Sequence, residues 1–405
     1  MSASIYCLGA LNLGVVKSMS SVFRDRSKLS PRYFPDQLPH RENEIAGIVN
    51  VYSRSATDPD HFPLTILQVI GPAGIGKTSS VLRATTRLQE LYQRNRQKLS
   101  VAYVNLKLQG GNKYAIYRSL LDRVAPELPA QGLSAEDMLR YLLRYLRENN
   151  RYALIVLDEI DYLIKISKET SIIYDLTRLN EFEPDKPCNV KGVVFIARST
   201  EFHSRLDAAE LSTLGRIPVA FEPYSIEQIA DILESRSSEA FAPKALGSDV
   251  IDQVSVITAS PDVRSDIRFA LDLLLYAGNL AESSGSSRVT LEHIRTVHGQ
   301  MSPSVTSEDI EQLSKNHIVA LLALVRALKS RKKAFVELKD VRAFASEVAD
   351  QIGTKRIDVE DYLDDLKSRR TIDIRSFREI GLHGASLSEV ESLLLKRLET
   401  DKNGG

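Results

Sequence analysis

A glycine-rich stretch has the residue types and the spacing of a phosphate-binding turn. Residues 69–78 read VIGPAGIGKT, and the four defining positions of the P-loop pattern fall on Gly71, Gly76, Lys77 and Thr78. Glycines let the backbone direct its N–H groups at phosphate oxygens, and a helix that begins near Lys77 would add the positive end of its dipole. A chance match to four such positions arises about once in 30,000 sites at average residue usage, which disfavours a glycine-rich turn without a ligand.

The P-loop pattern gives its residues separate roles. Lys77 is expected to reach the β- and γ-phosphates of a nucleotide, and the Thr78 hydroxyl is expected to bind Mg²⁺. We therefore expect ATP or ADP, together with Mg²⁺, as the cofactors. The predicted nucleotide contacts from this stretch are Gly71, Pro72, Ala73, Gly74, Ile75, Gly76, Lys77, Thr78 and Ser79.

A pair of acidic residues follows a second apolar run. Residues 154–157 are all apolar, which predicts a buried strand, and Asp158 and Glu159 come at its end. Asp158 is the candidate magnesium ligand beside Thr78, and Glu159 is the candidate base that orients or deprotonates the attacking water. The alternative is that the two acids only mark the end of a strand and have no role in catalysis. The P-loop in the same chain makes this alternative less favoured.

Strands alternate with helical segments around both motifs. The predicted strands are 64–70, 100–106, 152–161, 192–199 and 216–223, and helical patterns cover 78–97, 114–124 and 135–149. This alternation predicts an α/β fold in which a parallel sheet carries helices on both faces. After Pro223 the strand signal stops, and residues 225–298 are predicted to form a small helical domain.

The last part of the chain has the pattern of a DNA-binding domain. A polar linker at 298–309 precedes predicted helices at 309–330, 337–351 and 356–369, and the stretch TIDIRSFREIGLHGAS then predicts a hairpin. Three helices followed by a hairpin make a winged helix, which is a helix-turn-helix variant.

Composition excludes several classes of protein. The chain has 405 residues and a formal net charge of zero, so attraction to nucleic acid must come from local patches. Two cysteines, Cys7 and Cys188, exclude a disulfide framework and a cysteine-rich metal site. No apolar run approaches the roughly 20 residues of a membrane helix, so we expect no membrane partner. The low cysteine usage fits a reducing compartment, and we expect a cytoplasmic protein, associated with the nucleoid if it binds DNA.

The order of these parts resembles a known family. A P-loop, an acid pair and a helical lid resemble AAA+ ATPases, and the added winged helix resembles the archaeal origin-recognition and cell-division-control type replication initiators. The resemblance covers about residues 29–400 and is also carried by YFPDQLPHRENEI, FEPYSIEQIADILESR and SDIRFALDLL. It implies an ATP-binding AAA+ base domain at 29–223, a helical lid at 224–300 and a winged helix at 308–400, and the residues before it predict a disordered extension at 1–28. Met1 and Met19 are both candidate start residues.

The resemblance adds nucleotide contacts outside the P-loop. It implies that Arg41 lies near the adenine, that Tyr224 and Arg236 contact nucleotide, and that Arg268 reaches the γ-phosphate as the second sensor and acts in catalysis with Asp158 and Glu159. An arginine on the surface of a helix is the alternative for Arg268.

Two positions depart from the family pattern. The first sensor is usually asparagine, but Arg198 falls there, and Ala209 falls at the usual trans-acting arginine, with Arg205 and Arg216 as nearby substitutes. Weak sensing of the γ-phosphate would make hydrolysis slow, so we expect tight retention of ADP and a protein that acts mainly as a nucleotide switch.

The predicted DNA contacts lie in two regions. The AAA+ insertion of the family implies contacts from the tip of a loop, and the winged helix implies contacts from its third helix and hairpin. Five acids in the third helix leave solvated charge or protein docking as alternatives. The predicted residues are Gln131, Gly132, Lys355, Arg356, Lys367, Arg369, Arg370, Arg375, Arg378 and His383.

The resemblance implies an ATP-dependent initiator that binds double-stranded origin DNA and helps load the replicative helicase, with a paralogous initiator as a further partner. Two alternatives remain open on the residues. One is a DNA-binding AAA+ regulator without an origin role, and the other is a clamp-loader-like ATPase whose last domain binds only protein.

Overall fold

The computed structural model describes residues 21–109, 112–128, 131–166, 170–215, 218–301, 310–311, 313–369, 371–376, 379–382 and 386–403. The chain forms two compact units. One consists of Phe34–Ile232 and Thr258–Phe269, and the other of Met1–Tyr33, Leu233–Ile257 and Ala270–Gly405. The predicted lid at 224–300 is thus divided between the units, and its boundaries stay predictions.

The first unit is built on a parallel sheet. Its strands are β1 (Thr65–Ile70), β2 (Leu99–Asn105), β3 (Tyr152–Asp158), β4 (Val190–Ala197) and β5 (Val219–Ala220), in the order β2-β3-β4-β1-β5. All of these neighbours pair in parallel, which confirms the predicted α/β fold. Strands β3 and β4 are buried along their whole length, because their nearly continuous apolar sequence suits a strand covered on both faces.

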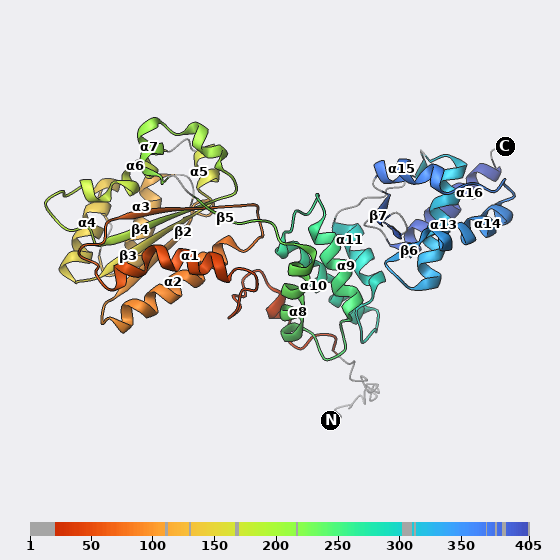
Figure 1. Cartoon of the computed structure of the whole chain (residues 1–405), viewed down its shortest axis with the longest axis horizontal. Helices are drawn as coiled ribbons and strands as arrows, with labels where there is room; N and C mark the ends of the chain where they lie inside the picture. The colour runs from red at the N-terminus through yellow and green to blue at the C-terminus, as the bar shows by residue number, and fades with distance from the viewer. Residues whose placement is uncertain are drawn as a thin grey trace, which may run out of the picture. The chain divides into compact units, whose positions relative to one another are not determined.

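Helices cover the sheet. Figure 1 shows α1 and α2 along one face of the sheet. The main core joins the sheet to α3, α4, α5 and α6, where Ile116, Leu142 and Ile155 are fully buried. The helices of this unit are α1 (Glu42–Ser53), α2 (Lys77–Arg94), α3 (Lys113–Val124), α4 (Ala135–Glu148), α5 (Ile160–Ile166), α6 (Ser171–Thr177) and α7 (Ala208–Thr213).

Between the sheet and residue 301 the structure describes four helices, in the region predicted to be helical. They are α8 (Ile226–Ala240), α9 (Ser248–Ala259), α10 (Ile267–Ser283) and α11 (Leu291–Met301). Among the described helices, none combines the length and the apolar character needed to cross a membrane.

The predicted disorder at 1–28 is wrong for residues 21–28. Phe23 stacks on Phe241 with 4.9 Å between ring centroids, and Val22 is fully buried. The N–H groups of Arg24 and Asp25 both donate to the carbonyl of Ala240. These apolar side chains find a core only in the folded second unit, which the local sequence does not show. Residues 1–20 lie outside the described residues.

The end of the second unit has the elements of a winged helix. Helices α13 (Lys315–Arg331), α14 (Leu338–Ile352) and α15 (Glu360–Ser368) share one core with an antiparallel sheet of order β6-β8-β7. The strands are β6 (Phe335–Glu337), β7 (Ile372–Ser376) and β8 (Glu379–Leu382). The structure adds β6 and a further helix, α16 (Leu387–Asn403), that the sequence analysis does not predict. Helix α13 begins later than predicted because Ser314 caps it, accepting the N–H of His317.

Candidate nucleotide-binding site

The P-loop joins β1 to α2, and its glycines are structurally required. A Cβ on Gly71 would lie 2.5 Å from the carbonyl oxygen of Phe221, and one on Gly74 would lie 1.8 Å from the Asp266 carboxylate. Gly76 caps α2 with φ of +88°, a left-handed conformation that only glycine adopts at little cost. The loop therefore holds its backbone close to two neighbouring segments and directs the N-terminus of α2 toward a ligand.

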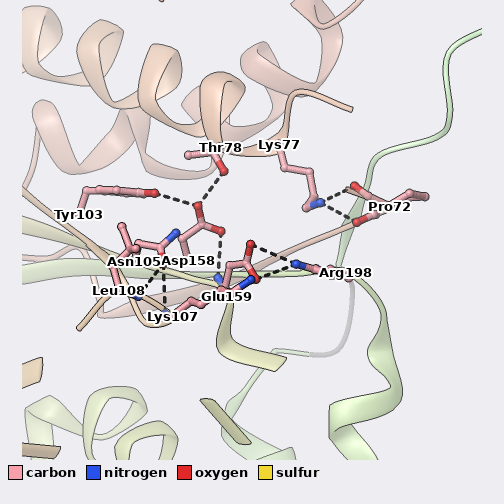
Figure 2. A network of polar contacts seen from close by, with 11 residues as sticks. Pro72, Lys77, Thr78, Tyr103, Asn105, Lys107, Leu108, Asp158, Glu159 and Arg198 are labelled. Carbon is pink, nitrogen blue, oxygen red and sulfur yellow. Dashed lines mark hydrogen bonds and ion pairs between the residues drawn. The ribbon is translucent and has the colours of Figure 1, made fainter. Parts of the chain in front are cut away.

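The side chain of Lys77 is turned into the loop. Its Nζ donates hydrogen bonds of 2.6 Å to the carbonyl oxygens of Gly71 and Pro72 (Figure 2). Burial lowers the pKa of Lys77 to about 8, against the opposing attraction of Asp158. The ammonium is held by the loop's own carbonyl oxygens, and an anion bound in the loop would favour its charged form.

Asp158 is the centre of a polar network. Its Oδ2 accepts hydrogen bonds from Thr78 Oγ1 at 2.7 Å and from the Tyr103 hydroxyl at 2.9 Å, and its Oδ1 accepts the Glu159 N–H at 2.9 Å (Figure 2). Burial raises the pKa of Tyr103, with Asp158 adding to the effect, so the phenol remains a hydrogen-bond donor.

These residues fit a magnesium ion. A buried carboxylate and a hydroxyl lie within hydrogen-bond distance of each other beside the phosphate loop. Mg²⁺ prefers oxygen ligands and is commonly held by one or two protein side chains together with substrate phosphates. Within the described residues there is also no cluster of three or more His, Cys, Asp or Glu side chains that would hold a metal in a full protein cage.

Glu159 is held in an unusual conformation by its neighbours. Its φ is +62°, which is uncommon outside glycine and often marks a functional position. Arg198 Nη2 contacts Glu159 Oε2 at 3.0 Å and Oε1 at 3.4 Å, an ion pair that Figure 2 shows. The candidate base is therefore paired with Arg198, the residue predicted to fall at the first-sensor position.

One pocket unites these parts. Arg268 reaches it from the first turn of α10, where the Ile267 N–H donates to the Gly74 carbonyl at 3.2 Å. The structure thus brings both predicted acids and the predicted second sensor to the P-loop. The lining residues are Ala73, Gly74, Lys77, Thr78, Asp158, Glu159, Asp161, Ile196, Ala197, Arg198 and Arg268.

Arg41 and Tyr224 lie together on another side of the P-loop. The Arg41 guanidinium is buried 3.9 Å from the centre of the Tyr224 ring and donates to the carbonyls of Ile75 (3.1 Å) and Glu222 (2.8 Å). Burial raises the pKa of the Tyr224 hydroxyl. The two predicted residues are thereby joined to the backbone of the loop.

Arg236 has a different environment. It belongs to the second unit, where its Nη2 donates to the carbonyls of Lys28 and Ser30 and its guanidinium lies 4.7 Å from the Tyr33 ring centre. Its role toward nucleotide stays a prediction.

The sequence analysis misses two site residues, Tyr103 and Asp161. The pairing of β2 with β3 brings Tyr103 to Asp158, and the start of α5 brings Asp161 to the pocket.

Comparison with known proteins agrees with this geometry. The AAA domain family matches residues 63–206, and the Cdc6 AAA+ ATPase-type lid domain matches residues 230–299. The ORC1-type DNA replication protein 1 of Sulfurisphaera tokodaii is 30% identical over 346 residues, which cover 84% of this chain and 82% of that protein. The chain belongs to the ORC1/Cdc6 family of DNA replication initiators.

Solved structures of this family support the assignment. The crystal structure of Cdc6p from Pyrobaculum aerophilum matches with a TM-score of 0.81 at 24% identity, covering 94% of this chain and all of that chain, which shows the shared fold. The Aeropyrum pernix ORC1 protein, solved in complex with DNA, matches with a TM-score of 0.60 at 28% identity, covering 92% of this chain and 97% of that chain. The ORC1/Cdc6 assignment carries with it an AAA+ nucleotide-binding domain, in accord with the pocket at the P-loop.

The trans-acting arginine of the family pattern is predicted to fall on Ala209, with Arg205 and Arg216 as substitutes. Ala209 lies in α7, beside the capping box that Asp207 and Glu210 form, and it offers no charge to a neighbouring molecule. Arg205 contacts the carbonyl of Lys165 at 3.4 Å, and Arg216 lies outside the described residues.

The Arg198–Glu159 ion pair is expected to slow ATP hydrolysis. Replacing Arg198 with asparagine is expected to raise ATP turnover about two- to fivefold, since an exposed ion pair is worth roughly 0.2–1 kcal/mol. Steady-state phosphate release measures this, and Arg87→Asn, at an exposed arginine of α2 that does not line the pocket, is the control. A fall in turnover would instead show that Arg198 stabilises the transition state.

The predicted DNA contacts in the winged helix are partly engaged with acids. Arg356 pairs with Asp350 at 3.2 Å, and Arg369 pairs with Asp365 at 2.7 Å, while Lys355 and Lys367 are exposed. Arg375 lies in β7, and Arg370, Arg378 and His383 lie outside the described residues.

The predicted DNA contacts in the first unit lie in a turn. Gln131 and Gly132 are exposed before α4, with Gly132 at φ of +79°. That conformation suits a glycine and leaves the backbone of the turn open to a ligand.

Proposed function

We propose that this chain is an ATP-dependent initiator that binds replication-origin duplex DNA through its winged helix and the turn at Gln131 and Gly132. It helps to load the replicative helicase, together with a paralogous initiator. The ATP-bound and ADP-bound forms are the two states of its conformational switch. One observation carries the proposal: Lys77, Thr78, Asp158, Glu159 and Arg268 line a single pocket in a chain that also contains a winged helix.

The pocket supports binding and slow hydrolysis of ATP. Lys77 and the N-terminus of α2 hold the phosphates, and Thr78 with Asp158 would hold Mg²⁺, which neutralises phosphate charge when bound. Glu159 orients the attacking water, but its ion pair with Arg198 engages both carboxylate oxygens, which must be freed to contact that water. Hydrolysis is therefore slow, and each nucleotide stays bound for long enough to act as a conformational signal.

Arg268 can link the state of the bound nucleotide to a helix that extends beyond the pocket. It lies in the first turn of α10, and the residues of that helix from Ala270 onward belong to the second unit. A γ-phosphate that attracts Arg268 acts on an element with residues in both units. ATP and ADP then differ in their interaction with α10, which is the condition for a ligand to shift a conformational equilibrium.

Nuclease footprinting of the full chain on fragments that contain the mapped replication origins of its host tests the origin role. We expect protection of a short repeated element at origins, in the presence of ATP or ADP. Protection of elements elsewhere, with none at origins, would indicate a DNA-binding regulator. Absence of DNA binding at moderate salt would favour a clamp-loader-like ATPase, and capture of the purified replicative helicase tests the loading role separately.

A single lysine substitution tests the DNA-binding face. Lys367→Ala is expected to weaken duplex binding about three- to tenfold and to lower the slope of log affinity against log salt by about 1, as expected for one lost phosphate contact. Fluorescence anisotropy at several salt concentrations measures both. Lys98→Ala, at an exposed lysine before β2, is the matched control, and an equal effect of the two variants would argue against contact by α15.

A further inference from the structure

Tyr103 reaches the candidate magnesium ligand from the neighbouring strand. The register of β2 and β3 places Asn105 opposite Asp158 and Tyr103 opposite Val156. Tyr103 and Asp158 are therefore diagonal neighbours on one face of the sheet, a separation that a long aromatic side chain spans. The Tyr103 hydroxyl donates to Asp158 Oδ2 at 2.9 Å (Figure 2).

The residue directly opposite Asp158 is used for another purpose. Asn105 accepts the N–H groups of Lys107 at 3.1 Å and Leu108 at 3.2 Å, so its side-chain oxygen shapes the turn after β2. Asp158 Oδ2 receives its two side-chain hydrogen bonds from Thr78 and Tyr103. If the Thr78 oxygen turns a lone pair toward a metal, its O–H can still donate to Asp158, and the Tyr103 hydroxyl is a second donor that fixes the orientation of the same carboxylate oxygen.

We propose that Tyr103 is a positioning residue that orients the Asp158 carboxylate for Mg²⁺ and so sets the magnesium affinity of the nucleotide complex. The proposal rests on the proposed nucleotide site. Partners of metal-ligating carboxylates fix the direction of the lone pairs, and their loss typically reduces metal affinity about 10- to 100-fold. The alternative is that Tyr103 only fills space beside the sheet, and phenylalanine would then replace it without consequence for the metal.

A magnesium titration of the Tyr103→Phe variant separates these roles. Fluorescent ADP is bound to the full-length protein in EDTA, and Mg²⁺ is then added at fixed nucleotide concentration. We expect the midpoint of the Mg²⁺ response to rise about tenfold, while the affinity for ADP in EDTA changes less than about twofold. Tyr114→Phe, at a half-exposed tyrosine in α3, is the control and should match the wild-type protein in both measurements.

Three outcomes would overturn the inference. An unchanged Mg²⁺ midpoint would show that the hydroxyl does not orient Asp158. Equal losses of ADP affinity in EDTA and in Mg²⁺, accompanied by a lower melting temperature, would show a structural role alone. If the wild-type protein binds no nucleotide under either condition, the proposed function fails first, so that its failure is distinguishable from failure of the Tyr103 assignment.

Discussion

Replacing Lys77 with alanine is expected to weaken the binding of both ATP and ADP by at least about 100-fold. Charge-assisted hydrogen bonds are worth roughly 1.5–3 kcal/mol each, and each 1.4 kcal/mol is a factor of ten in affinity. The Lys77 ammonium is largely buried and donates to the carbonyls of Gly71 and Pro72. When a nucleotide fills the loop, Lys77 is expected to turn to its phosphates, so the alanine variant would leave buried phosphate charge without its partner. Titration with fluorescent nucleotide, with Mg²⁺ present, measures the loss.

The control for this variant is Lys98→Ala, which removes an exposed lysine just before β2. It should bind nucleotide like the wild-type protein, and both variants should retain the wild-type circular dichroism spectrum. If Lys77→Ala binds ATP with unchanged affinity, the phosphates do not lie at residues 71–78, and the assignment of the site is wrong.

Glu159→Gln is expected to reduce ATP turnover by about 100-fold or more, because a positioned general base contributes roughly 10²–10⁴-fold. Glutamine keeps the shape of the side chain but cannot accept a proton, and it also loses the charge that attracts Arg198. Affinity for ATP should change less than about threefold, since Glu159 is not among the groups that hold the phosphates. Single-turnover hydrolysis and equilibrium nucleotide binding, measured on the same preparation, separate the two effects.

Glu201→Gln, at an exposed acid beyond β4, is the matched control and should hydrolyse ATP at the wild-type rate. Equal rates for Glu159→Gln and the wild-type protein would mean that another residue handles the water. Asp161 would then be the next candidate, because it lines the same pocket and burial raises its pKa.

The sequence by itself predicts the parts of this protein that depend on neighbours along the chain. The spacing of Gly71, Gly76 and Lys77 indicates the phosphate loop, and the apolar run before Asp158 predicts a strand that ends at the site. Alternation of apolar runs with helical patterns predicts the parallel sheet, and the three helices before the wing follow from their periodicity. These features can be predicted from the sequence because spacing within a few residues determines which side of a helix or strand each side chain occupies.

Tertiary structure decides which distant residues meet. The register of β2 against β3 brings Tyr103 to Asp158, and the position of β4 beside β3 pairs Arg198 with Glu159. Packing against Phe241 orders Phe23 in a segment that otherwise reads as an extension. Such contacts join residues tens to hundreds of positions apart, and each contributes only a small free energy that local propensity does not encode, so they emerge only when the whole core forms.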